Sequence, residues 1–201
     1  MSDLIYYERN LPHRLPAGEA IFLTFRLAGS LPSEVLARMR AEAELLQKSG
    51  EAQGPGRFYN EQKRYFGRFD DLLARAEYGP TWLRKPEVAS LVAQSLHYFD
   101  GKSYELLAYC LMPNHVHLVV RLPLGASPLL RTLQRLKSYT AVQANKLLGC
   151  SGAFWQAESY DHIVRNGELP RIISYVVENP VKAGLVEDWQ QWPHTYVTPA
   201  L

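Results

Sequence analysis

The sequence predicts an α+β fold in which one antiparallel sheet packs against helices. One observation is a pair of β-rich runs, Tyr104–Met112 and His115–Leu122, which only Pro113 and Asn114 separate, as in a tight hairpin. The other is a set of long, capped runs of helix-forming residues. Of the 201 residues, 47% are hydrophobic and 21% charged, which suffices for one core and excludes disordered, collagen-like and coiled-coil chains.

The first elements are a strand and a helix. Ala20–Leu27 is rich in branched and aromatic residues and precedes Gly29, which favours a strand. Ser33 then caps a run of strong helix formers over Glu34–Lys48, and this helix stops near Gly50.

The remaining elements follow after an insert. They are a helix over Glu87–Phe99, the two hairpin strands, a helix over Ser127–Leu148, a strand over Ser159–Val164 and a helix over Glu168–Glu178, ended by Asn179 and Pro180. With helices on one face of the sheet, this order is closest to a ferredoxin-like core. We expect a single domain over 1–201, with a basic, aromatic insert around 50–80 and a C-terminal extension after 180.

Charge and cysteine usage limit the possible environments. The net charge of +2 means that affinity for a polyanion must come from local patches. Cys110 and Cys150 lack metal-site spacing, which favours reduced thiols in a cytosol. The N-terminal acids and prolines do not suit a signal peptide, and no run approaches the ~20 apolar residues of a membrane span. We therefore expect a cytoplasmic protein without a membrane partner.

Two histidines on a predicted strand form a candidate metal site. His115 and His117 are two residues apart, so both imidazoles lie on one face of the sheet and could share one ion. Two histidines on a solvated face are an equally good interpretation of this pair alone. Two imidazoles also do not complete a site.

The last helix offers a candidate for the third ligand. Tyr175 and Asn179 are four residues apart, which puts their Cβ atoms about 5–6 Å from one another on one helix face. A phenol and an amide oxygen could thus approach the same ion. Taken alone, Asn179 fits better as a helix cap and Tyr175 as a core residue.

Two basic segments are candidates for contacts with nucleic acid. The insert combines Arg57, Lys63, Arg64 and Arg68 with four aromatic residues and suits phosphate binding and base stacking, although core aromatic side chains with solvated charges explain this segment better when it is taken alone. The run Leu130–Lys146 holds no acid and carries Arg131, Arg135, Lys137 and Lys146. A solvated helix face is the alternative for this second segment.

Three strings together resemble the REP-associated tyrosine transposases, which belong to the HUH class of single-strand DNA transposases: MPNHVHLVV, FWQAESYDHIVRN and YVVENPVKAGLVEDWQQWP. The N-terminal FLTFRLAGSLP also fits a subgroup. The resemblance implies a ferredoxin-like, RNA-recognition-like nuclease domain that cuts single-stranded DNA near palindromic hairpins. It places the metal-binding histidines at His115 and His117, the nucleophile at Tyr175 and the third ligand at Asn179, with Mg²⁺ or Mn²⁺ as the ion.

The implied reaction is attack by Tyr175 on a phosphodiester, which leaves a 5′-phosphotyrosine and a free 3′-hydroxyl and permits strand transfer. Tyr139 is the runner-up nucleophile, and Tyr160 is a weaker one. The expected partner is single-stranded or hairpin DNA at the nucleoid, without a small-molecule cofactor, for a monomer or homodimer. Two alternatives stay open: a zinc hydrolase with His162 as a third imidazole beside His115 and His117, and a hairpin-binding protein without catalysis.

Overall fold

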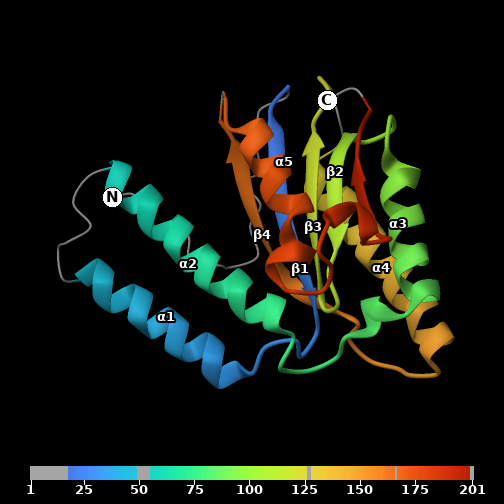
Figure 1. Cartoon of the computed structure of the whole chain (residues 1–201), viewed down its shortest axis with the longest axis horizontal. Coiled ribbons are helices and arrows are strands. Elements are labelled where there is room, and N and C mark those ends of the chain that lie inside the picture. Colours follow the sequence, from blue (N-terminus) through green and yellow to red (C-terminus); the bar gives the residue numbers. More distant parts are fainter. Residues whose placement is uncertain (1–17, 49–54, 126–127, 166, 200–201) are drawn as a thin grey trace.

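A five-stranded sheet forms the centre of the computed structural model, which describes residues 18–48, 55–125, 128–165 and 167–199 (Figure 1). The strand order is β4-β1-β3-β2-β5, and each neighbouring pair is antiparallel. The strands are β1 (Ala20–Leu27), β2 (Glu105–Leu111), β3 (His115–Arg121), β4 (Trp155–Val164) and β5 (Thr195–Val197). The predicted α+β class and the antiparallel sheet are therefore confirmed.

The helices cover both faces of this sheet. They are α1 (Ser33–Lys48), α2 (Pro55–Arg75), α3 (Pro86–Phe99), α4 (Leu129–Leu148), α5 (Leu169–Val177) and α6 (Asn179–Lys182), with 3₁₀ turns at Trp82–Arg84 and Trp189–Gln191. One core joins the sheet to α3 and α4, and a second core joins the opposite face to α1, α2 and α5. None of the described helices has both the length and the apolar composition to cross a membrane.

The expectation that helices pack on one face was wrong, and the strands explain why. All eight residues of β1 and six of the seven in β2 are buried. A strand that is apolar at consecutive positions, without polar alternation, buries both of its faces. The run AIFLTFRL carries this signal in the sequence.

The register of β1 against β3 places the candidate site on the second of these faces. Val116, Leu118 and Val120 point into the core with α3 and α4, whereas Val119 lies in the core with α2 and α5. Because side chains alternate along a strand, His115 and His117 share the face of Val119. In the pairing of β3 with β1, His115 lies opposite Arg26 and His117 lies opposite Thr24.

The ends of the chain's later elements differ from the prediction. β4 begins at Trp155 rather than at Ser159. Between these two residues a bulge places three β4 residues opposite the single residue Arg26, so the alternation of side chains that marks a strand is interrupted there. The helix predicted over Glu168–Glu178 matches α5, but a further short helix, α6, follows directly at Asn179, where the prediction ended the helical segment. The segment after 180 contains β5, which pairs with β2 and was not predicted.

The insert contains the helix α2, whose middle packs on the sheet. Phe66, Phe69 and Leu73 are buried in the core that includes α5. For Phe66 the core explanation therefore holds instead of base stacking. In Figure 1, α1 and α2 lie side by side as an arm beside the sheet, and Arg68 joins them through an ion pair with Glu42 at 2.5 Å.

Candidate metal centre and nucleophile

Three ligand-type side chains meet on the β3 face. Asp70 of α2 joins His115 and His117, and one ligand atom from each lies within 4.8 Å of the others. The Nε2 atoms of the two imidazoles are 3.1 Å apart, and Asp70 Oδ1 lies 3.3 Å from His117 Nε2 and 3.8 Å from His115 Nε2. Both histidines are 0% exposed, and Asp70 is 3% exposed.

The outer nitrogen of each imidazole has its own partner. His115 Nδ1 lies 2.7 Å from Asn114 Oδ1, and His117 Nδ1 lies 2.9 Å from Thr24 Oγ1. An amide oxygen only accepts, so Nδ1 of His115 is the donor and its Nε2 keeps a lone pair. Such partners fix the tautomer and the ring orientation of a metal-binding histidine.

The electrostatics leave the cluster ready to bind a cation. Burial, together with the neighbouring His117, lowers the pKa of His115 to about 3 against the opposing effect of Asp70. Burial acts to raise the pKa of Asp70, but interactions with His117, His115 and Tyr175 outweigh it and hold the pKa at about 2. Neutral His115 and ionised Asp70 are the forms that coordinate metals.

The donor set fits a divalent cation. Metal bonds of about 2.0–2.2 Å place neighbouring ligand atoms about 3 Å apart, close to the separations observed here. Asp70 Oδ1 is buried and has no hydrogen-bond partner among the residues that the structure describes, so it is an acceptor that an ion would satisfy. Two imidazoles and a carboxylate are also ligand types that occur together in catalytic metal sites.

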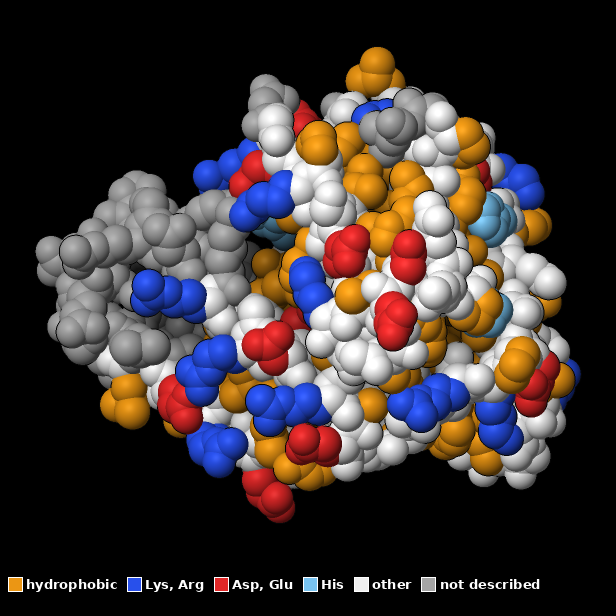
Figure 2. Space-filling view, viewed as in Figure 1, with side chains coloured by type: hydrophobic (Ala, Val, Ile, Leu, Met, Phe, Trp, Pro, Cys, Tyr) orange, Lys and Arg blue, Asp and Glu red, His pale blue; other side chains and the backbone are white. Residues whose placement is uncertain are grey.

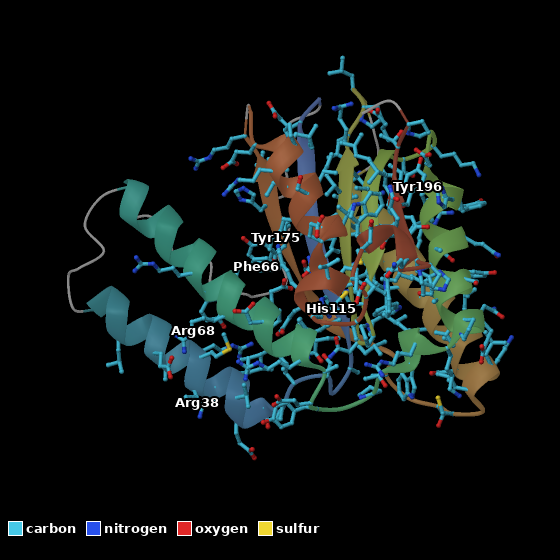
Figure 3. All side chains as sticks on the ribbon, viewed as in Figure 1. Arg38, Phe66, Arg68, His115, Tyr175 and Tyr196 are labelled. Atoms are coloured by element: carbon cyan, nitrogen blue, oxygen red, sulfur yellow. The ribbon has the colours of Figure 1, made fainter. Side chains whose placement is uncertain are left out.

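Tyr175 lies against this cluster. Its hydroxyl donates a hydrogen bond to Asp70 Oδ2, so the two oxygens of one carboxylate face the phenol and the imidazoles. The ring packs edge-on against Phe22 and His117, with centroids 6.0 and 5.9 Å away, and Lys182 Nζ lies 4.3 Å from its centroid. Burial, together with the charge of Asp70, raises the pKa of Tyr175. Figure 3 shows Tyr175 and Phe66 on the same side of the sheet.

The structure brings Asp70, rather than the other two candidates, to the histidine pair. Asn179 Nδ2 donates to the carbonyl of Tyr175 at 2.7 Å, a local contact across one helical turn. His162 Nε2 lies 3.5 Å from Glu168 Oε2. Asp70 therefore replaces both Asn179 and His162 as the candidate third ligand beside His115 and His117.

Sequence reasoning missed Asp70, although a signal was present. Asp70 lies between Phe69 and Leu73 and one turn after Phe66, on the apolar face of α2. An acidic residue in an apolar helix stripe needs a buried partner.

The alternative tyrosines differ in position. Tyr139 is 56% exposed on α4, across the sheet from the histidines. Tyr160 stacks on Phe66 with ring centroids 4.0 Å apart and pairs with Thr24 across β4 and β1. Tyr175 is the tyrosine whose hydroxyl the structure joins to Asp70.

The candidate DNA contacts are spread over both faces. Arg131 and Arg135 are exposed on α4, where Arg135 lies over the Phe99 ring at 5.5 Å. Arg64 is exposed on α2, and the side chains of Arg57 and Lys63 lie outside the described residues. Figure 2 shows further Lys and Arg side chains, mixed with acidic ones, over α1 and α2.

Lys137 has an internal role that corrects its assignment as a DNA contact. Its Nζ donates to the carbonyls of Gln156, Ala157 and Glu158 at 3.0, 3.3 and 3.4 Å and contacts Ser159 Oγ at 2.8 Å. These acceptors use all three of its N–H groups. Lys137 therefore holds the bulge of β4 in place.

Comparisons with known proteins show the family to which the chain belongs. The family model described as "Transposase IS200 like" matches residues 76–179, more than half of the chain. The chain belongs to the IS200-like transposase family. The match includes both histidines and Tyr175, whereas Asp70, Thr24 and Arg26 precede it.

Named relatives confirm the resemblance to REP-associated tyrosine transposases. A Haemophilus influenzae protein that provisionally bears this name is 28% identical over 102 residues, which cover 46% of this chain and 58% of that protein. The REP-associated tyrosine transposase of Escherichia coli K12 is 28% identical over 93 residues, covering 46% and 53%. The chain thus spans about half the length of these relatives.

A solved structure has the same fold. It is a REP-associated tyrosine transposase bound to a REP hairpin, with a TM-score of 0.52 and 18% identity over 97% of this chain and 82% of that one.

Proposed function

We propose that this protein cleaves single-stranded DNA beside palindromic hairpins and transfers the cut strand through a covalent bond to Tyr175. The observation that carries the proposal is the hydrogen bond from Tyr175 to Asp70, the residue that also faces His115 and His117. Candidate nucleophile and candidate metal ligands thus form one cluster. Family membership and the hairpin in the related structure's title favour DNA as the substrate.

In this reaction the phenolic oxygen of Tyr175 forms a bond to phosphorus, and the bond from phosphorus to the 3′-oxygen breaks. The phenolic proton leaves along the hydrogen bond to Asp70, and the departing 3′-oxygen takes up one proton to become a 3′-hydroxyl, so the step neither gains nor loses a proton overall. A Mg²⁺ or Mn²⁺ ion held by His115, His117 and Asp70 would polarise the phosphoryl oxygens and offset their growing charge. Attack by another 3′-hydroxyl on the 5′-phosphotyrosine reverses these bonds and joins strands.

The neighbouring residues position these groups. Asn114 and Thr24 fix the imidazoles, and Phe22 and Lys182 both contact the ring of Tyr175. Because both histidines are fully buried, a phosphodiester reaches them only when some of the side chains that cover them move aside. Arg131, Arg135 and Arg64, together with Arg57 and Lys63, are proposed to contact phosphates outside this centre.

A cleavage assay tests the proposal. Labelled hairpin DNA with a single-stranded flank is incubated with the protein and Mn²⁺ and then run on a denaturing gel. We expect a covalent protein–DNA band that chelation abolishes. Hydrolysis without such a band, with stoichiometric zinc in the protein, would favour a zinc hydrolase. Hairpin binding without cleavage in any metal would indicate a binding protein.

A further inference from the structure

β1 carries a buried arginine beside the candidate metal centre. Arg26 is the partner of His115 across β1 and β3, as Thr24 is the partner of His117. Partners on one face of an antiparallel pair have Cβ atoms about 4.5–5.5 Å apart. Arg26 is 5% exposed, so its guanidinium is buried, and the strand position that carries it lies opposite a proposed metal ligand.

This guanidinium has few partners for its five N–H groups. Its Nη1 donates to Ser30 Oγ at 3.1 Å, and its Cζ lies 5.9 Å from the centroid of Phe69. In the part of the chain that the structure describes, this bond to Ser30 is the one side-chain hydrogen bond that the Arg26 guanidinium makes. A buried cation needs a charged or polar partner, because burial removes its hydration.

The side chain of Arg26 lines a narrow, open pocket where β1, β4, α1 and α2 meet. Thr24 belongs both to the wall of this pocket and to the hydrogen bond with His117, so the pocket adjoins the metal centre. The other charged residues of the wall are Arg40 and Glu158. Tyr65 and Tyr160 add aromatic surface of the kind that nucleotides contact.

Positive charge exceeds negative charge around this pocket. Two basic residues, Arg26 and Arg40, line it with one acid, Glu158. Arg40 Nη2 lies 3.6 Å from Glu158 Oε1, and the two side chains are 46% and 33% exposed. Such a long, solvated ion pair is weak, so a stronger anion can replace the carboxylate beside Arg40.

We propose that this pocket binds one phosphate group of the DNA strand next to the phosphate that Tyr175 attacks, with Arg26 at its base and Arg40 at its rim. Guanidinium groups suit this ligand, since their planar donors match the geometry of phosphate oxygens. The inference rests on the proposed function, because it places the strand through the site of Tyr175. It assigns a DNA contact to β1 and α1, which lie outside the family match at residues 76–179.

Binding to phosphate-modified DNA tests this proposal. The probe is the labelled hairpin with a single-stranded flank, in which one phosphate at a time is replaced by an uncharged methylphosphonate, and affinity is measured in chelator so that no cleavage occurs. The full-length proteins are the wild type, Arg26→Gln, Arg40→Gln and the matched control Arg38→Gln. Arg38 is exposed on α1, and Figure 3 places it on the side of α1 away from α2.

We expect the wild type to lose about tenfold in affinity at one position of the flank, as for a lost charge-assisted hydrogen bond. Arg26→Gln should bind unmodified DNA about tenfold more weakly and lose nothing further at that position. The slope of log affinity against log salt should also fall by about 0.7. Arg40→Gln should also weaken binding to unmodified DNA and reduce the loss at the sensitive phosphate, both by less than Arg26→Gln. It supplies the test if Arg26→Gln does not fold. Arg38→Gln should retain the wild-type profile.

A wild-type profile without a sensitive position, or an unchanged profile in both Arg26→Gln and Arg40→Gln, would overturn the inference. The readout does not depend on cleavage. If the arginine variants lose the sensitivity to one phosphate but the cleavage assay gives no covalent band, the pocket is supported and the proposed reaction is rejected. If a covalent band forms but the variants keep the wild-type profile, the reaction is supported and the pocket is rejected.

Discussion

The hydroxyl of Tyr175 on α5 donates a hydrogen bond to the carboxylate of Asp70 on α2, across 105 residues of sequence. The other oxygen of that carboxylate faces His117 at 3.3 Å. Asp70 therefore links the candidate nucleophile to the candidate metal ligands.

Removing the hydroxyl of Tyr175 tests this link. Tyr175→Phe keeps the ring packing but leaves Asp70 without a donor, which should cost about 1–3 kcal/mol in the free energy of unfolding. The variant should bind hairpin DNA and form no covalent adduct. Denaturant titration and the denaturing gel measure these effects. Tyr139→Phe, on the exposed face of α4, is the control and should change stability by less than about 0.5 kcal/mol.

Asp70 should be required for metal binding. Asp70→Asn removes the negative charge while keeping the shape of the side chain, and we expect the affinity for Mn²⁺ to fall at least tenfold, about the range for perturbed metal sites. Isothermal titration calorimetry measures this affinity. Asp71→Asn, at the exposed neighbouring position, should bind Mn²⁺ as the wild type does. Equal affinities for the two variants would remove Asp70 from the site.

The buried imidazole of His115 should make stability depend on pH. Burial lowers its pKa from 6.5 to about 3, so between these values the unfolded chain binds a proton that the folded chain does not. The free energy of unfolding should therefore fall as the pH is lowered from 6 to 4, by up to about 1.4 kcal/mol per pH unit from this group. Urea titrations in chelator measure the slope.

His115→Gln should flatten this dependence, whereas His97→Gln, at an exposed position, should leave it unchanged. A His115→Gln slope equal to that of the wild type would mean that His115 titrates normally in the folded protein.

The exposed arginines of α4 should act on binding alone. Replacing Arg131 and Arg135 together by alanine should reduce the salt dependence of hairpin affinity by up to about two units, since each contact with a phosphate releases about one counterion. Because α4 packs on the face opposite His115, the metal affinity should not change. If affinity and salt slope are both retained, this face of α4 is solvated and does not contact DNA.

Local patterns predicted much of the fold and part of the site. The hairpin and its histidines follow from strand periodicity, because alternation alone sets the face on which His115 and His117 lie. Asp70 could not be placed in the same way, since its contact with Tyr175 depends on how α2 packs against α5. The short strand β5 has three residues and owes its place to pairing with β2, which no local propensity encodes.

Mapping the covalent adduct tests the central claim most directly. After reaction with hairpin DNA and Mn²⁺, nuclease and trypsin digestion followed by mass spectrometry identifies the modified tyrosine, because Tyr139, Tyr160 and Tyr175 fall in the separate tryptic peptides 138–146, 147–165 and 172–182. We predict the nucleotide on peptide 172–182 and its absence in Tyr175→Phe. A nucleotide on either of the other two peptides, with Tyr175→Phe still active, would contradict the account.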